Sequence, residues 1–520
     1  MKCLPRFTFR ESSRTGTYEE SVGFMTTLDW LVIAAYAAAM LGVGWYYSGR
    51  NETADDYNLG GRRMNPLAIG LSLFATLTSA LSYLALPGEM IKNGPMALAQ
   101  LLSYPLIVVV VGWGLIPFIM RQSATSAYEM LERRLGLSVR LVGSLMFLSM
   151  RLAWMASILF ATSDKVIAPL LGLGPWETLL AACVMCLVTI IYTSQGGLRA
   201  VVVTDAMQSL IMLGGAALVI IIISIELGGV SAWWPREWVA HWAPPKFWFD
   251  SSSRMTFLGI TTTAFAWYVC TYGSDQMAIQ RWLSTRNESA ARWSLITSLG
   301  TEAVVTLLLG AAGLAVFGYF TAHPSQFPES KDLLSGTDRL FPRFVLVGLP
   351  SGVTGIVIAA VLAAAMSSLS SGMNSSCAVI TEDFIVRFRN TPLTDASRVR
   401  LGQVISVGVG VLAILLSMLV SQIEGNLLDL CFRVVNLMVA PLFVLFFLAL
   451  FVPWSTTLGA LAAALASVST ALSISFSKSL GLGEISILWI TPGSFLVGIS
   501  VGGILSVLPI GPRSKTLPKR

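Results

Sequence analysis

Long apolar runs separated by short polar stretches dominate this chain. Runs of about 20 apolar residues occur, for example, at 30–47, 104–120, 176–193, 206–225, 401–420 and 434–453. A bilayer core about 30 Å thick needs about 20 apolar residues per helix, and only helices and closed barrels satisfy the backbone in lipid. The pattern therefore predicts an all-α polytopic membrane protein.

Window length and breaker residues predict about 13 transmembrane helices in a domain that covers residues 27–509. The expected spans are 27–47, 66–91, 97–120, 139–164, 176–194, 205–226, 255–279, 293–320, 344–382, 401–421, 427–452, 455–477 and 488–509. The stretch 344–382 is too long for one straight crossing, so we expect a break near Pro350 and Gly352. The N-terminal tail 1–26 lacks a signal-peptide pattern and is expected to be disordered, or untranslated if synthesis starts at Met25 rather than Met1.

The distribution of lysine and arginine predicts the orientation of the chain in the membrane. An outside N-terminus places more than half of the 34 basic residues in the inner loops and in the tail 510–520. Positive residues gather on the cytoplasmic side of membrane proteins. The expected arrangement is a multi-pass protein of the cell (inner or plasma) membrane, with its C-terminal tail in the cytoplasm.

Composition excludes several classes of function. Only 12% of the residues are charged and 55% are hydrophobic, whereas soluble domains carry about 25% charged residues. The six cysteines give no disulfide framework, and the two histidines, His241 and His323, lie far apart in loops. The spans hold no histidine and few carboxylates, so we expect neither an enzyme nor a bound cofactor, and the net charge of +6 forms no nucleic-acid-binding patch.

A stripe of hydroxyl groups lies in the apolar run "AAAMSSLSSGMNSS" (363–376). Ser367, Ser370, Ser371, Asn374 and Ser375 follow helical spacing and share one face. Small residues and serines commonly line helix–helix contacts in membranes, and composition alone favours that interpretation. A stripe of oxygens also suits a hard cation, provided that a second segment completes the ligand shell.

The segment "GLSLFATLTSALSYLALPGEM" (70–90) is the candidate for this partner. Thr76, Thr78, Ser79 and Ser82 interrupt its apolar pattern. Broken helices free backbone carbonyls at membrane depth, which is tolerated where those carbonyls line a cavity.

At this point the chain resembles the sodium:solute symporter family, from about residue 28 to 450. The linked motifs are "YNLGGRRM" (57–64), the segment 70–90, "SAYEMLERR" (126–134), "GGLRAVVVTDAMQ" (196–208), "SDQMAIQRWLS" (274–284) and "AAAMSSLSSGMNSS" (363–376). The resemblance implies a leucine-transporter-like core of five-plus-five inverted repeats, at about 66–226 and 255–452. It also implies a secondary active transporter that couples sodium influx to uptake of a small organic solute by alternating access. Its partners would be sodium, the solute and the lipid bilayer, with the solute, stoichiometry and oligomeric state left open.

The resemblance also implies residues for two sodium ions. Matched residue by residue, the first ion would be held by the carbonyls of Ala75, Thr78 and Ala364 and the hydroxyls of Ser367 and Ser368. A second ion, present in some family members, would be held by Asp205, Ser367, Ser370 and Ser371. The alternative for Asp205 is an ordinary helix N-cap after "GGLRAVVVT".

Arg151 is the main clue to the solute. It lies in the middle of a span, where an arginine is costly unless it is paired. Similarity to the sialic acid carriers implies contact with a substrate carboxylate. The alternative is a buried ion pair with an acid such as Glu302 or Asp164.

Further substrate-facing positions follow from the same resemblance: Ser79, Ser82, Gln100, Trp267, Tyr268 and Tyr272. Core packing is an equal alternative for the three aromatic residues. Galactose carriers have glutamine at Ser82 and glutamate near Gln100, and proline carriers have aspartate at Leu77, so neither specificity is supported. The sequence is closer to the carboxylate, vitamin and iodide branch, and the first expectation is an anionic solute.

Other functions must also be considered. A proton-coupled carrier, or a sugar or amino-acid carrier on the same fold, is the closer alternative. A membrane sensor module is more remote, because such proteins carry long signalling domains and only residues 510–520 follow the last expected span.

Overall fold

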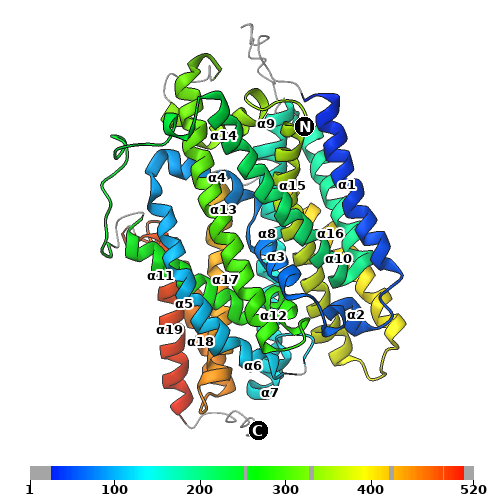
Figure 1. Cartoon of the computed structure of the whole chain (residues 1–520). Helices are drawn as coiled ribbons and strands as arrows, with labels where there is room; N and C mark the ends of the chain where they lie inside the picture. Colours follow the sequence, from blue (N-terminus) through cyan, green and yellow to red (C-terminus); the bar gives the residue numbers. More distant parts are fainter. Residues whose placement is uncertain are drawn as a thin grey trace, which may run out of the picture.

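The structure is a computed structural model of the whole chain, and it describes residues 25–122, 124–250, 255–326, 333–420, 427–483 and 485–508. Within these ranges the chain is helical and contains no strand, and Figure 1 shows most helices standing side by side in one bundle. Nine described helices are long and apolar enough to cross a membrane, or ten if the bent pair α3–α4 forms one span. The all-α architecture is confirmed, whereas the count of 13 spans stays a prediction. The predicted tails 1–26 and 510–520 lie almost wholly outside the described residues.

The first half of the chain contains α1 Thr27–Ser48, α2 Ala54–Leu59, α3 Pro66–Leu77, α4 Ala80–Asn93, α5 Tyr104–Val109, α6 Ile116–Met120, α7 Glu129–Leu135, α8 Leu137–Thr162, α9 Ala168–Leu171 and α10 Pro175–Glu226. The second half contains α11 Phe257–Ser274, α12 Gln276–Leu283, α13 Glu288–Ala322, α14 Thr337–Val347, α15 Val353–Val379, α16 Asp395–Val420, α17 Leu427–Phe451, α18 Thr457–Ser475 and α19 Ile490–Val507. Figure 1 places α6 and α7 at one end of the bundle, called here the α7 end, and α9 and α14 at the opposite end.

Two helices are broken inside the bundle. The axis bends by 68° between α3 and α4, and the side chain of Ser79 accepts the backbone N–H of Ser82 to cap α4. The second break separates α11 from α12 at Asp275, whose side chain accepts the N–H of Met277 at 2.8 Å. These breaks lie near the start of each predicted repeat, where transporters with inverted repeats place discontinuous helices. The repeats themselves stay a prediction.

Several predicted spans have different boundaries in the structure. The spans 176–194 and 205–226 follow each other in α10 without an intervening loop, and the chain turns sharply between them at Gly197, with φ +58°. A side chain at Gly197 would meet the carbonyl of Tyr57 at 2.8 Å, so both the backbone angle and the space require glycine. The long stretch 344–382 is divided as expected, because Gly352 adopts φ +86° between α14 and α15.

A buried carboxylate joins the start of the first helix to the start of α15. Oδ1 of Asp29, near the start of α1, accepts the backbone N–H groups of Gly352 and Gly355, both at 2.8 Å. Its Oδ2 accepts the N–H and hydroxyl of Thr26, which completes a capping box. Because four donors satisfy the oxygens of this buried carboxylate, it fixes α1 to the start of α15 without an unsatisfied acceptor.

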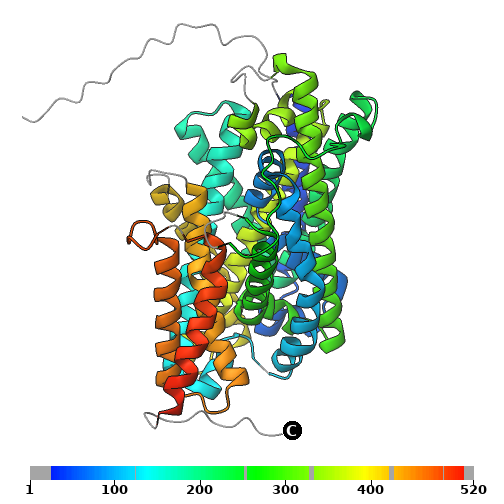
Figure 2. The ribbon, with the colours of Figure 1, turned by 90° about the vertical axis from the view of Figure 1, so that its left-hand side faces the viewer.

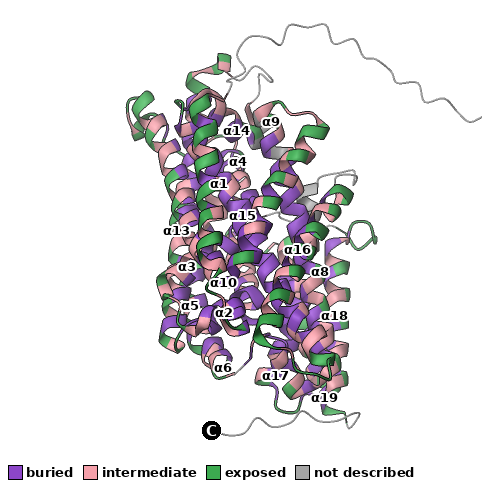
Figure 3. Ribbon diagram, turned by 90° about the vertical axis from the view of Figure 1, so that its right-hand side faces the viewer, coloured by how far each residue is buried: buried purple, intermediate pink, exposed green. Residues whose placement is uncertain are grey.

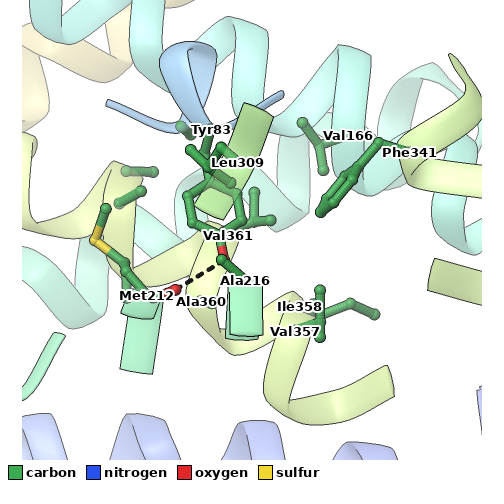
Figure 4. Close-up of a cluster of buried hydrophobic side chains, with 14 of the residues drawn as sticks. Tyr83, Val166, Met212, Ala216, Leu309, Phe341, Val357, Ile358, Ala360 and Val361 are labelled. Carbon is green, nitrogen blue, oxygen red and sulfur yellow. Dashed lines mark hydrogen bonds between the residues drawn. The ribbon is translucent and has the colours of Figure 1, made fainter. Parts of the chain in front are cut away.

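The centre of the bundle is built around α15, in which nearly every residue is buried (Figure 3). Toward the α14 end, side chains from α4, α10, α13, α14 and α15 form the apolar cluster of Figure 4, in which the Tyr83 hydroxyl donates to the carbonyl of Met212 at 2.9 Å. Two C-terminal helices, α18 and α19, lie side by side at the edge of the bundle (Figure 2). The polar serines of α15 are therefore enclosed by packed helices rather than facing lipid.

Candidate functional site

The end of α3 meets the serine stripe of α15. The hydroxyl of Ser367 donates to the carbonyl of Ala75 at 2.7 Å and to the carbonyl of Ala364 at 3.2 Å. The hydroxyl of Ser368 donates to the carbonyl of Thr76 at 3.2 Å. All of these residues are buried. The structure thus brings together four of the five residues predicted for the first sodium ion: Ala75, Ala364, Ser367 and Ser368.

Thr78, the fifth predicted residue, lies at the break itself. It caps α3 with an extended backbone conformation, at φ −87° and ψ 110°, and its N–H donates to the carbonyl of Phe74. Its hydroxyl donates to the carboxylate of Glu302 on α13. The break turns the chain out of the helix beside the α15 serines, so neutral carbonyl and hydroxyl oxygens gather at one place. A hydroxyl that donates one hydrogen bond keeps lone pairs for a cation, and hard cations prefer oxygen ligands.

A second polar cluster surrounds Asp205 on α10. Its Oδ2 accepts the hydroxyls of Ser72 at 2.6 Å and Ser371 at 3.2 Å, and its Oδ1 accepts the hydroxyl of Ser370 at 3.4 Å. The structure therefore brings together three of the four residues predicted for the second sodium ion, Asp205, Ser370 and Ser371. The fourth, Ser367, meets this cluster through its carbonyl, which accepts the hydroxyl of Ser370 at 3.0 Å. Asp205 lies inside α10, so the alternative interpretation as a helix N-cap is wrong.

Arg281 completes this second cluster, and the sequence interpretation missed it. Its guanidinium donates to Asp205 at 3.0 Å and to Ser72 at 2.8 Å, and it also contacts the hydroxyl of Ser371. The predicted spans 255–279 and 293–320 leave Arg281 in an inner loop between them, whereas its side chain is 1% exposed. The prediction fails because α12 folds back into the bundle after the break at Asp275. The motif "SDQMAIQRWLS" contained the residue but gave no sign of its partner.

Arg151 is paired inside the bundle. Its guanidinium forms an ion pair with Asp275, the residue that caps α12, and both side chains are buried. The guanidinium also lies 5.6 Å from the ring centre of Phe147. The acid in this pair is neither of those considered in the sequence analysis, Glu302 and Asp164. The pair ties α8 to the second helix break.

The predicted substrate-facing aromatic residues of α11 form a ladder of stacked rings with Trp282 of α12. Tyr268 stacks on Tyr272 with ring centres 5.8 Å apart, and Tyr272 stacks on Trp282 at 5.6 Å. Trp267 meets Tyr268 edge to face, and Tyr268 also meets the ring of Tyr104. This ladder is mostly buried, so its rings contribute to the packing of the bundle. This role does not depend on where the solute binds.

The predicted polar positions lie near this ladder or near the first break. Ser79 and Ser82 form the first turn of α4. Gln100 lies in the 3₁₀-helix Pro95–Ser103, which packs against α11, and its carbonyl accepts the hydroxyl of Ser103 at 2.6 Å. Their contact with a solute stays a prediction.

An ionic network closes the α7 end of the bundle. Arg140 on α8 contacts Asp383, just beyond α15, at 2.6 Å, and Glu132 on α7 at 2.6 Å. Arg387 also pairs with Glu132 at 2.7 Å, and its hydrogen bond holds the pKa of Glu132 below the usual value, with Arg140 adding to the effect. The hydroxyl of Ser126 donates to Asp383 at 2.8 Å. The motif "SAYEMLERR" therefore supplies residues that join α7 and α8 to the extension of α15.

A model of the sodium:solute symporter family matches residues 57–467, most of the chain. The chain belongs to this family. It is a sodium-coupled solute symporter and a multi-pass membrane protein, with sodium as the coupling ion, and it is not an enzyme. The sodium/sialic acid symporter NanT of Aliivibrio fischeri is 30% identical over 458 residues, which cover 86% of this chain and 87% of the relative. The sodium-coupled monocarboxylate transporter 1 of Mus musculus is 30% identical over 468 residues, covering 88% and 75% respectively.

The fold is also similar to solved structures. A sodium-coupled sialic acid symporter in a substrate-bound outward-open state superposes with a TM-score of 0.81 at 26% identity, covering 95% of this chain and all of that one. The nucleobase-cation-symport-1 family transporter Mhp1 has a TM-score of 0.52 at 11% identity, which shows a shared fold alone. The helical arrangement is therefore that of a known class of sodium-coupled carriers.

Proposed function

We propose that this symporter imports a small organic acid, driven by a sodium ion held between the end of α3 and α15. The contact of the Ser367 hydroxyl with the Ala75 carbonyl, at the break between α3 and α4, carries the proposal. A sodium ion shared by these oxygens ties α3 to α15. Sodium and solute should then each raise the affinity of the other by the same factor, which couples their transport.

The proposed solute carries a carboxylate. The relatives described above are named for sialic acid and monocarboxylates, which supports this class. Leu77, Ser82 and Gln100 differ from the residues of proline and galactose carriers. Arg151 is the candidate partner for the carboxylate, in exchange for its present partner Asp275. Sugar or amino-acid transport and proton coupling are the alternatives that the experiments below separate.

The α7 end is proposed to face the cytoplasm. Basic residues concentrate there, among them Arg133, Arg134, Arg140 and Arg387, as the positive-inside rule predicts. α1 starts at the opposite end, which puts the N-terminus outside (Figure 1). The ionic network of Arg140 and Asp383 then closes the cytoplasmic side.

Uptake into proteoliposomes tests the proposed function. Radiolabelled monocarboxylates, sialic acids, vitamins, amino acids and sugars are screened with and without an inward sodium gradient. We expect at least one carboxylate to accumulate at least tenfold faster with the gradient, and collapsing the gradient with an ionophore should remove the difference. Full uptake in sodium-free buffer at acidic pH would instead identify a proton-coupled carrier.

Arg151→Gln tests the assignment of the solute carboxylate. We expect at least a tenfold loss of carboxylate uptake, because the amide cannot replace the charge that the solute would pair with. Stabilisation of the purified variant by sodium chloride should remain. Asp275→Asn is the matched control, since it breaks the same ion pair but keeps the arginine available. Equal loss of uptake in both variants would show that the pair is structural and that Arg151 does not recognise the solute.

A further inference from the structure

Glu302 is an acidic residue in the middle of α13, far from either end of the helix. Acids within membrane spans are costly and usually functional. Its carboxylate accepts the hydroxyl of Thr78, the residue that ends α3 at the helix break. The sequence analysis considered Glu302 only as a partner for Arg151, which pairs with Asp275 instead.

Polar side chains share the face of α13 that carries Glu302. Ser298, Glu302 and Thr306 follow i, i+4, i+8 spacing and share one face of α13. The hydroxyl of Ser298 lies 3.2 Å from that of Tyr272. The hydroxyls of Tyr104 and Tyr268 are 3.4 Å apart. The face of α13 that carries Glu302 is therefore lined by hydroxyl groups.

The other charged groups on α4, α10, α12 and α13 lie at helix ends or pair with other residues. α3 has no ionisable side chain, while Glu89 and Lys92 lie in the last turns of α4. Asp205 on α10 pairs with Arg281 on α12. On α13 itself, Arg292 pairs with Glu288 one turn away. Among the residues that the structure describes, no lysine or arginine forms an ion pair with Glu302.

Thr78 connects this carboxylate to the proposed sodium site. Its hydroxyl binds Glu302, and its carbonyl is one of the five oxygens proposed for the first sodium ion. All five of those oxygens are neutral, so the site itself supplies no countercharge. The Glu302 carboxylate contacts the same residue whose carbonyl is a proposed ligand. In a region of low dielectric constant, this carboxylate attracts a cation far more strongly than it would in water.

We propose that Glu302 supplies the negative charge of the first sodium site and positions Thr78 at the helix break. This inference rests on the proposed function, because it takes the ion to bind between α3 and α15. Glu302 is a positioning and countercharge residue rather than a ligand: it acts through Thr78 and through its electric field. The sodium ion in turn neutralises a carboxylate to which the described part of the chain supplies no ion-pair partner.

Glu302→Gln tests this inference, because the amide keeps the shape and can still accept the Thr78 hydroxyl. The probe is sodium chloride alone, titrated against choline chloride while the unfolding temperature of the detergent-solubilised full chain is recorded. We expect the sodium concentration for half-maximal stabilisation to rise at least tenfold, with the unfolding temperature in choline chloride unchanged or higher. Thr78→Val, which removes the hydroxyl but keeps the carbonyl, should give a smaller rise.

Two controls separate charge from structure. Glu177→Gln removes a carboxylate at the start of α10. Thr306→Ala changes the same face of α13, one turn from Glu302. In both variants, the sodium concentration for half-maximal stabilisation should equal that of the unmodified chain. An unchanged sodium titration for Glu302→Gln would overturn the inference. If Ser367→Ala also leaves the titration unchanged, the proposed sodium site fails. If Ser367→Ala removes the sodium response and Glu302→Gln does not alter it, only the role of Glu302 fails.

Discussion

Replacing Ser367 with alanine is expected to lower sodium-driven uptake at least 100-fold. The substitution removes the hydroxyl that joins α15 to the carbonyl of Ala75 at 2.7 Å, and with it one of five proposed ligands. A site of neutral oxygens has no strong ligand to compensate for the loss. Initial rates of solute uptake in proteoliposomes, measured over a range of sodium concentrations, provide the test. Ser368→Ala should act in the same direction.

Ser375→Ala is the matched control for this prediction. Ser375 belongs to the same stripe, two turns further along α15, but its hydroxyl donates to the carbonyl of Ser371 within its own helix at 2.7 Å. Its replacement should leave the sodium dependence within about twofold, since hydrogen bonds of this kind contribute about 1 kcal/mol at most to stability. An equal loss in Ser367→Ala and Ser375→Ala would mean that the stripe serves packing, which composition alone favoured.

The stripe and the helix break were both accessible from the sequence. Helical periodicity placed Ser367, Ser370 and Ser371 on one face, and the polar interruption at 75–82 marked the break that the structure shows after Leu77. Their meeting was expected only through the family resemblance. Periodicity says which residues share a helix face, but it does not say which two helices pack together.

The ion pairs could not be predicted for the same reason. Asp275 and Arg151, like Asp205 and Arg281, are far apart in sequence and meet only after α12 has folded back into the bundle. Hydropathy places Arg281 in a loop because its short helix is not apolar. Gly197 shows a similar limit: its positive φ decides how α10 turns, yet a glycine between two apolar runs looks like any loop residue.

Replacing Arg281 with alanine is expected to give the largest loss of stability. The substitution leaves Asp205 buried without its ion-pair partner, and breaking a buried pair in this way costs about 3–5 kcal/mol. The unfolding temperature in choline chloride should therefore fall. Ser72 and Ser371 also lose their contacts with the guanidinium, so the junction of α3, α10, α12 and α15 should loosen.

Sodium chloride should restore much of this loss, which makes the same variant a test of the second sodium assignment. Without the guanidinium, Asp205 keeps its contacts with Ser370 and Ser371, so three of the four residues predicted for that ion stay together. Sodium should therefore raise the unfolding temperature of Arg281→Ala more than that of the unmodified chain. The double variant Asp205→Asn, Arg281→Ala removes the charge as well, and should be more stable than Arg281→Ala in choline chloride but lack the additional sodium response. If sodium stabilises the single and double variants equally, Asp205 holds no ion, and its buried charge serves to fix Arg281 and the broken helix α11–α12 against α10.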